Sequence, residues 1–313
     1  LRGCVINGAL ATANKAYAQL QKDGIEADVT VTRLAEDAYL VVTPAATRQA
    51  DEIWLRRHVG DRNVVITDVT PGEGVLAVMG PKARAVMQAV SPNDFGNDTN
   101  PFGTAQQIEL GMGLARVHRV SYVGELGWEI YVSADMAAHA FETLWQAGQA
   151  HGMMLCGMHM MDSCRIEKGF RHFGHDISSE DHVLEAGLGF AVKENKTPSK
   201  FGRMIGADAV AAKRNDGLSQ RLMQFRLTDP DPLLYHNEAI YRDGAVIGYL
   251  TSGNYGHYLG GAIGLGYVKR NSIGETAEAQ LNAHYQIDVA GKLVDAEVTL
   301  RPLYDPKALQ VKM

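Results

Sequence analysis

The stretch 107-QIELGMGLARVHRVSYVGELGWEIYVS-133 contains runs of alternating apolar and polar residues, separated by glycine-bearing segments. A period of two predicts strands, and glycine suits the turns between them because it adopts positive φ angles without strain. In the last run Trp128, Ile130 and Val132 share one face, whereas Glu129 and Tyr131 share the other. A helix from about residue 135 to 148 follows, with Phe141, Leu144 and Trp145 as expected core residues. We therefore predict a sheet covered by a helix.

Upstream of this stretch, strands and helices alternate loosely. The segment 23-DGIEADVTVTRL-34 predicts a strand in which Glu26, Asp28 and two threonines share one face. A helix is expected over residues 43–60, with Thr43 as its cap and Pro44 at its first position. Further strands at 63–70 and 74–80 and a helix at 81–90 complete an α+β pattern.

Downstream, a shorter helix at 157–169 leads into the loop 169-GFRHFGHDIS-178, where periodicity stops. Beyond the polar stretch 212-AKRNDGLSQ-220 the sequence changes to short alternating segments separated by turns, which is typical of a small all-β unit. We therefore predict an α+β fold: a body of sheet-plus-helix subdomains at residues 1–211 and a C-terminal β-barrel domain at 212–313.

The composition narrows the class of partner. With 30 basic and 36 acidic residues the net charge is -6, and no long basic run suggests nucleic-acid binding. No apolar stretch is long enough to cross a bilayer, and the N-terminus lacks the pattern of a signal sequence. We expect a cytoplasmic protein, or a mitochondrial matrix protein in a eukaryote, that binds a small molecule and neither nucleic acid nor membrane. Its three cysteines predict buried thiols rather than disulfides.

Glu129 and Tyr131 allow two interpretations. A carboxylate two places from an aromatic residue is ordinary on the wet side of a strand. The same pair also suits a flat heteroaromatic ligand, because a carboxylate accepts two parallel hydrogen bonds from adjacent ring N–H and amino donors while an aromatic ring covers the ligand's face. The strand pattern alone does not choose between them.

Other polar groups carry weaker signals. His172, His175 and Asp176 suggest a metal site, with His182 close in sequence, but no HExxH or comparable signature accompanies them, so we predict no metal. The run 165-RIEKG-169 has charges at helical spacing and predicts an exposed, internally paired helix face. Periodicity and spacing alone predict only an α+β protein with a candidate site for a planar ligand.

Ordered motifs along nearly the whole chain carry a resemblance. The segments are GIEADVTVTRL (24–34), YVGELGWEIYV (122–132), DSCRIEKGFRHFGHDIS (162–178), LEAGLGFAVK (184–193), YLTSGNYGHYLG (249–260) and LRPLYDP (300–306). They resemble the glycine-cleavage T-protein (aminomethyltransferase) family, most of all the folate-binding C-terminal portion of dimethylglycine and sarcosine dehydrogenases. The resemblance implies tetrahydrofolate as cofactor and handling of one-carbon units.

Three residues match the family's site. Asp28 matches its catalytic acid, whereas Glu26 does not; Glu129 matches the carboxylate that holds the amino-pyrimidine edge of the pterin, and Tyr122 matches a tyrosine near the pterin. The resemblance thus implies that Asp28 assists one-carbon transfer and that Glu129 and Tyr122 bind folate. For the strand 23–34 alone, the wet-surface interpretation remains open.

The chain also departs from the family pattern. Pro44 stands where typical T-proteins have an asparagine, and Met161 stands where they have an arginine, so we expect a more apolar pterin site and assume no lipoyl-carrier partner. The family's opening segment is missing, which suggests part of a larger polypeptide. An upstream formaldehyde-generating domain, flavin-dependent or other, would be the partner, and any FAD would belong to that domain.

The expected reaction is capture of formaldehyde, or of an iminium from methylamine oxidation of the dimethylglycine or sarcosine type, as 5,10-methylenetetrahydrofolate. Two alternatives stay open. One is methyl transfer that gives 5-methyltetrahydrofolate, and the other is a non-catalytic folate-binding module.

Overall fold

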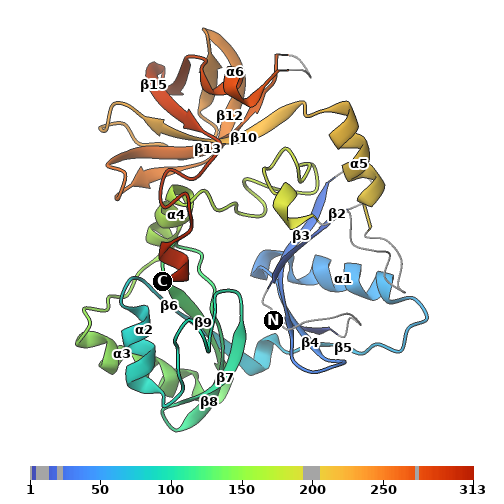
Figure 1. Cartoon of the computed structure of the whole chain (residues 1–313), viewed down its shortest axis with the longest axis vertical. Coiled ribbons are helices and arrows are strands. Elements are labelled where there is room, and N and C mark those ends of the chain that lie inside the picture. Colours follow the sequence, from blue (N-terminus) through green and yellow to red (C-terminus); the bar gives the residue numbers. More distant parts are fainter. Residues whose placement is uncertain (1, 5–13, 20–23, 193–204, 272–274) are drawn as a thin grey trace. The chain divides into compact units, whose positions relative to one another are not determined.

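The computed structural model describes residues 2–4, 14–19, 24–192, 205–271 and 275–313 of the chain (Figure 1). The chain divides into two compact units: unit 1 comprises residues 1–16, 28–156 and 308–313, and unit 2 comprises residues 17–27 and 157–307. The predicted division into domains 1–211 and 212–313 stays a prediction.

Unit 1 contains a four-stranded sheet and most of a five-stranded sheet, of which residues 17–19 and 25–27 belong to unit 2. The five-stranded sheet has the order β2-β3-β4-β1-β5, with β1 at Arg2–Cys4, β2 at Asn14–Gln19, β3 at Ile25–Arg33, β4 at Tyr39–Val42 and β5 at Ile66–Asp68. The four-stranded sheet has the order β6-β9-β8-β7, with β6 at Glu73–Met79, β7 at Ala105–Leu110, β8 at Gly113–His118 and β9 at Gly127–Ser133.

Helices cover the outer faces of these sheets. The helices are α1 at Arg48–Val59, α2 at Ala83–Val90 and α3 at Ala137–Gln149, with 3₁₀ turns η1 at Ala45–Thr47, η2 at Thr70–Gly72, η3 at Ala134–Met136 and η5 at Gln310–Lys312. One core joins Trp128 and Ile130 of β9 to α2 and α3, and another joins Val41 to Leu55 of α1. Figure 1 shows the resulting layers: α2 and α3, the four-stranded sheet, the five-stranded sheet, and α1.

Sequence periodicity located β3, β5, the strands β6 to β9 and the helices α1 to α3 but not β1, β2 or β4, and three local predictions were wrong. The α-helix begins at Arg48 rather than near Thr43, because Pro44 precedes a 3₁₀ turn and the Thr43 hydroxyl hydrogen-bonds to Asp51 instead of capping. Phe141 is 39% exposed, whereas Leu144 is buried as expected. The Cys156 thiol is exposed rather than buried, Cys164 is partly buried, and the side chain of Cys4 lies outside the described residues.

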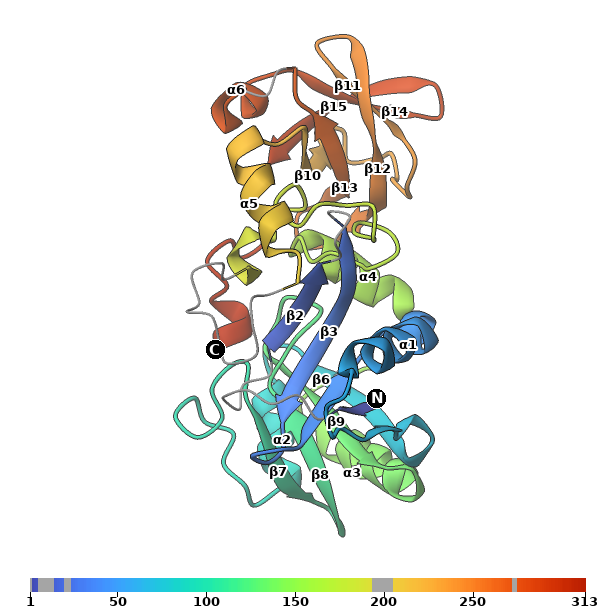
Figure 2. The same cartoon turned by 90° about the vertical axis from the view of Figure 1, so that its right-hand side faces the viewer.

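Unit 2 contains a closed six-stranded barrel with the order β10-β13-β12-β11-β14-β15, which Figure 2 shows from a second side. Its strands are β10 at Gln220–Leu227, β11 at Ala239–Arg242, β12 at Ala245–Gly256, β13 at Gly261–Lys269, β14 at Tyr285–Val289 and β15 at Lys292–Thr299. Its helices are α4 at Met158–Glu167, α5 at Ala207–Asp216 and α6 at Ala277–Leu281, with a 3₁₀ turn η4 at Gly189–Ala191. The predicted α+β fold with a C-terminal barrel is confirmed.

The loop after α4 packs in unit 2 around Ile25. The backbone N–H of Ile25 donates to the carbonyls of Ser178 and Asp181, and the Ile25 side chain is buried beside Ile177 and Val183. A Cβ at Gly24 would lie 1.5 Å from the Ser179 carbonyl oxygen. The glycine that opens the motif at 24–34 is therefore required by close backbone approach.

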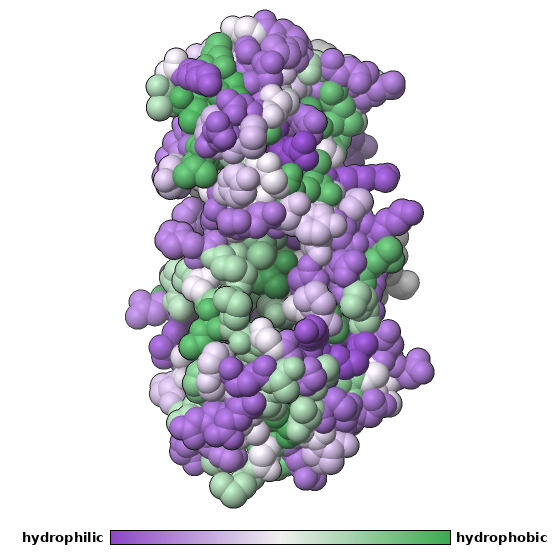
Figure 3. All heavy atoms as spheres, turned by 90° about the vertical axis from the view of Figure 1, so that its left-hand side faces the viewer, coloured by the Kyte–Doolittle hydropathy of each residue, from purple (hydrophilic) through white to green (hydrophobic). Residues whose placement is uncertain are grey.

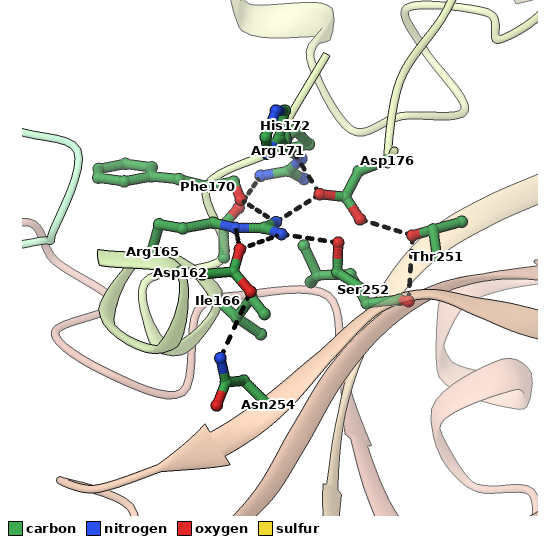
Figure 4. A network of polar contacts seen from close by, with 12 residues as sticks. Asp162, Arg165, Ile166, Phe170, Arg171, His172, Asp176, Thr251, Ser252 and Asn254 are labelled. Atoms are coloured by element: carbon green, nitrogen blue, oxygen red, sulfur yellow. Dashed lines mark hydrogen bonds and ion pairs between the residues drawn. The ribbon is translucent and has the colours of Figure 1, made fainter. Parts of the chain in front are cut away.

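A buried polar network ties this loop and α4 to the barrel (Figure 4). The Arg165 guanidinium, 2% exposed, donates to Asp176 at 2.5 Å and to the Ser252 hydroxyl at 2.8 Å. Asp176, fully buried, also accepts from the Thr251 hydroxyl at 2.6 Å and from the backbone N–H of His172 at 2.9 Å. The run 165–169 is thus not the exposed helix face that its charge spacing predicted.

The described surface mixes polar and apolar side chains. Large exposed hydrophobic residues include Met112, Met154, Leu155 and Met158. Figure 3 shows hydrophobic groups separated by hydrophilic side chains on one face, which is common on protein surfaces. Within the described part of the chain, no helix combines the length and apolar character needed to cross a lipid bilayer.

We predict that Asp176→Ala lowers the free energy of unfolding by about 3–5 kcal/mol, because it leaves a buried guanidinium without its main anionic partner. Urea unfolding of the full chain measures the change. The control is Asp229→Ala, which breaks a 3.4 Å ion pair with Lys292 at side-chain exposures of 37% and 71% and should cost less than about 1 kcal/mol. Equal losses in the two variants would contradict the structural role of the network.

Candidate functional site

The two sheets of unit 1 meet through a small mixed contact surface. On β4, Leu40 is buried against Tyr131 of β9, with Val42 and Val69 packed around them. On β3, the Thr32 hydroxyl lies 3.4 Å from Nε2 of His118, and both side chains are buried. The face of β3 that carries Thr32 is therefore the one turned toward the four-stranded sheet.

Asp28 lies on this same face of β3. It precedes Thr32 by four residues, and alternation gives both the same side of the strand, whereas Val29 and Val31 pack on the α1 side. Four residues of strand span about 13 Å. Along that length burial falls, because Thr32 is 3% exposed while Thr30 and Asp28 are half-buried. Asp28 thus stands at the more open end of the face.

Glu129 lies on the opposing four-stranded sheet, also between buried and exposed positions. Its neighbour across the β8 pairing is His118, which is fully buried, and its neighbour across the β6 pairing is Ala77, which is exposed. Glu129 itself is half-buried. Its carboxylate is therefore supported by protein on the β8 side and approachable from the β6 side.

Tyr131 holds one oxygen of this carboxylate. Its hydroxyl donates to Oε2 of Glu129 at 2.5 Å, and its ring is 3% exposed. Burial, followed by the nearby charge of Glu129, raises the pKa of Tyr131 far above its ordinary value, so the phenol stays a neutral donor. The sequence pattern allowed this ring to cover the face of a ligand. At 3% exposure it is instead a buried side chain that supports Glu129.

His118 packs against the other side of Tyr131. The two ring centroids are 4.4 Å apart at an interplanar angle of 38°. Burial, with a smaller effect from the charge of Arg116, lowers the pKa of His118 to about 4. The imidazole is therefore neutral at physiological pH. Nothing in the run RVHRV marked His118 as part of a site, since only the packing of the sheets brings it there.

Tyr122 lies in the segment 120–126 that leads into β9 and is half-buried.

The two residues that depart from the family pattern lie in different surroundings. Pro44 is exposed in unit 1, and Met161 is half-buried in α4 of unit 2. The rings of His172 and His175 are tilted by 59° with their centroids 4.6 Å apart. In the described part of the chain, no three His, Cys, Asp or Glu side chains group in a way that could hold a metal ion.

Family models match both parts of the chain. The GCVT N-terminal domain matches residues 6–196, and the glycine cleavage T-protein C-terminal barrel domain matches residues 220–305. The chain belongs to the glycine cleavage T-protein family.

Two relatives with similar sequences are much longer than this chain. The chain is 39% identical over 289 residues to a 4-methylaminobutanoate oxidase (formaldehyde-forming) from Paenarthrobacter nicotinovorans, and the match covers 92% of this chain and 34% of the oxidase. It is 31% identical to the mitochondrial sarcosine dehydrogenase of Mus musculus, covering 93% of this chain and 33% of that enzyme. The chain spans about a third of the length of these two relatives.

A solved structure supports the fold. The glycine cleavage system aminomethyltransferase T from Bartonella henselae superposes with a TM-score of 0.81 at 23% identity, covering 97% of this chain and 84% of that one. This T-protein likeness confirms the architecture. The roles of Asp28, Glu129 and Tyr122 stay predictions.

The buried His118 predicts a specific pH dependence of stability. The unfolded chain takes up a proton on this residue below about pH 6.5, whereas the folded chain does so only near pH 4. Stability is therefore fully present above pH 6.5 and falls as the pH drops through this window, by roughly 2 kcal/mol between pH 7 and pH 5. Urea unfolding of the wild type and His118→Asn at both pH values measures the difference, which the variant should lack.

His284→Asn is the matched control, because the His284 side chain is 59% exposed. It should keep the wild-type pH dependence. If His118→Asn also keeps it, the imidazole is not held neutral by burial.

Proposed function

We propose that this chain binds tetrahydrofolate and uses it to capture a one-carbon unit, formaldehyde or an iminium from methylamine oxidation, as 5,10-methylenetetrahydrofolate. The supporting observation is that Asp28 and Glu129 are half-buried carboxylates on the sheet faces that meet at Thr32 and His118. Membership of the T-protein family, and a relative described as formaldehyde-forming, favour this substrate class.

Glu129 supplies recognition. An ionised carboxylate has about four acceptor positions, so the bond from Tyr131 still leaves capacity for two parallel donors on a ligand. The pyrimidine edge of a pterin offers such a pair, a ring N–H and an exocyclic amino group, and paired donors on a carboxylate give orientation as well as affinity. The half-buried position of Glu129 strengthens these bonds relative to bulk water.

Asp28 supplies acid–base assistance. Tetrahydrofolate offers two amine nitrogens, and its combination with formaldehyde gives 5,10-methylenetetrahydrofolate and one water. Attack of N5 on formaldehyde, with transfer of the N5 proton to the oxygen, gives a carbinolamine. In the ring closure that follows, N10 loses its proton and the hydroxyl gains one and leaves as water, so a single carboxylate that gives one proton and takes one balances this step. Such positioned assistance is commonly worth about 10²- to 10⁴-fold in rate. The anion also stabilises cationic intermediates through its charge.

The match to only part of two longer relatives favours a separate domain that supplies the one-carbon unit. It spans about a third of the oxidase and of the sarcosine dehydrogenase. We propose that it works as the folate-dependent part of a demethylating amine dehydrogenase, with FAD bound by a companion domain. The amine donor would be a small methylamine derivative.

Two substitutions separate the two roles. Asp28→Asn should lower the enzymatic rate of methylenetetrahydrofolate formation, above the uncatalysed background, by about 10²-fold or more with little change in folate affinity. Glu129→Gln should weaken tetrahydrofolate binding by about 10- to 100-fold, because it replaces hydrogen bonds to an anion. Calorimetry measures binding, and mass analysis of the folate product measures transfer.

Glu26→Gln on β3 and Glu109→Gln on β7 are matched controls and should leave both properties unchanged. A 5-methyl product would establish methyl transfer instead. Folate binding without turnover above background would indicate a binding module, and the absence of any folate binding would refute the proposal.

A further inference from the structure

Tyr131 makes a contact that neither the sequence motif nor the family pattern assigns. It occupies the position two residues after Glu129, on the same face of β9, and donates its hydroxyl proton to Oε2 at 2.5 Å. A short hydrogen bond to an ionised acceptor is among the stronger ones in proteins. The contact fixes one oxygen of the carboxylate that is proposed to bind the pterin.

The Tyr131 hydroxyl is itself held in place by packing. Leu40 from the facing sheet packs against the ring together with Val42 and Val69, and the tilted ring of His118 lies with its centroid 4.4 Å from that of Tyr131. His118 is in turn the β8 partner of Glu129 and contacts the Thr32 hydroxyl on β3. The chain of contacts therefore runs from the facing sheet through two buried rings to the carboxylate.

This arrangement restricts the rotamers of Glu129 before a ligand arrives. A glutamate in solution loses side-chain freedom when it binds a ligand, and ordering each such side chain costs part of the binding free energy. A carboxylate already oriented by a buried donor avoids that cost. The neutral phenol suits the role, because it can donate to the carboxylate but cannot compete with it for ligand donors as an anion would.

We propose that Tyr131 is a positioning residue that orients Glu129 for the donor edge of the folate pterin, acting through the carboxylate without touching the ligand. The inference rests on the proposed function, and it assigns specificity for the amino-pyrimidine edge to the Tyr131–Glu129 pair. Asp28 on the facing strand keeps its separate role in transfer.

The test is a double-mutant cycle on tetrahydrofolate binding to the full chain. Tyr131→Phe should weaken binding by about 3- to 10-fold, the effect of releasing one oriented side chain. The same change in a Glu129→Ala background should alter binding by less than about 2-fold, because no carboxylate remains to be oriented. The transfer rate at saturating folate should stay within about 2-fold of wild type.

A second measurement separates positioning from general loosening of the sheet. A tetrahydrofolate analogue in which a methyl group replaces the 2-amino group lacks one of the two donors. The wild type should prefer tetrahydrofolate to this analogue, and Tyr131→Phe should reduce that preference. Tyr285→Phe is the matched control: it also removes a buried phenol oxygen, one that donates to the Gln280 carbonyl in the barrel, and it should leave the preference unchanged.

Three outcomes are distinguishable. If the wild type binds tetrahydrofolate and Glu129→Ala weakens binding while Tyr131→Phe does not, the positioning role is wrong and the proposed function stands. If Tyr131→Phe weakens binding equally in both backgrounds, Tyr131 acts independently of Glu129 and the inference is overturned. If the wild type binds no folate, the proposed function and this inference fail together.

Discussion

Burial of both faces of β9 is the constraint on which unit 1 depends. One face, with Trp128 and Ile130, packs on α2 and α3, and the other, with Tyr131, packs on β4 of the second sheet. A strand buried on both sides contributes apolar area to two cores at once. A polar residue on such a strand must find a partner, and Glu129 does so through the Tyr131 hydroxyl.

The same constraint explains why the polar groups differ so much in exposure. Thr32, His118 and Tyr131 lie where the two sheets are in contact, and all three are buried. Asp28 and Glu129 lie at half-buried positions on those faces. A ligand site needs this combination, because rigid buried neighbours orient a charged group while partial exposure leaves room for the ligand.

In unit 2, buried polar groups are satisfied by an ion pair rather than by a tyrosine hydroxyl. The Arg165–Asp176 pair and its hydroxyl partners Thr251 and Ser252 connect the loop after α4 to the strand β12. An irregular loop has few ladder hydrogen bonds of its own, so side-chain partners must satisfy its backbone, as Asp176 does for the N–H of His172. Arg165, whose charge spacing predicted an exposed helix face, therefore lies in the interior with Asp176.

The sequence by itself determined β3, the strands β5 to β9, the helices α1 to α4, the all-β character of the C-terminal part and the resemblance to the T-protein family, because period-two and period-3.6 patterns and motif order are local properties of the chain. It also ranked Asp28 above Glu26 through that resemblance. It could not identify His118 or the role of Tyr131, nor show that residues 165–168 are buried. These facts depend on contacts between residues far apart in sequence. Arg165 and Asp176 pair across 11 residues, and Thr32 meets His118 across 86, and only tertiary packing decides which such residues meet.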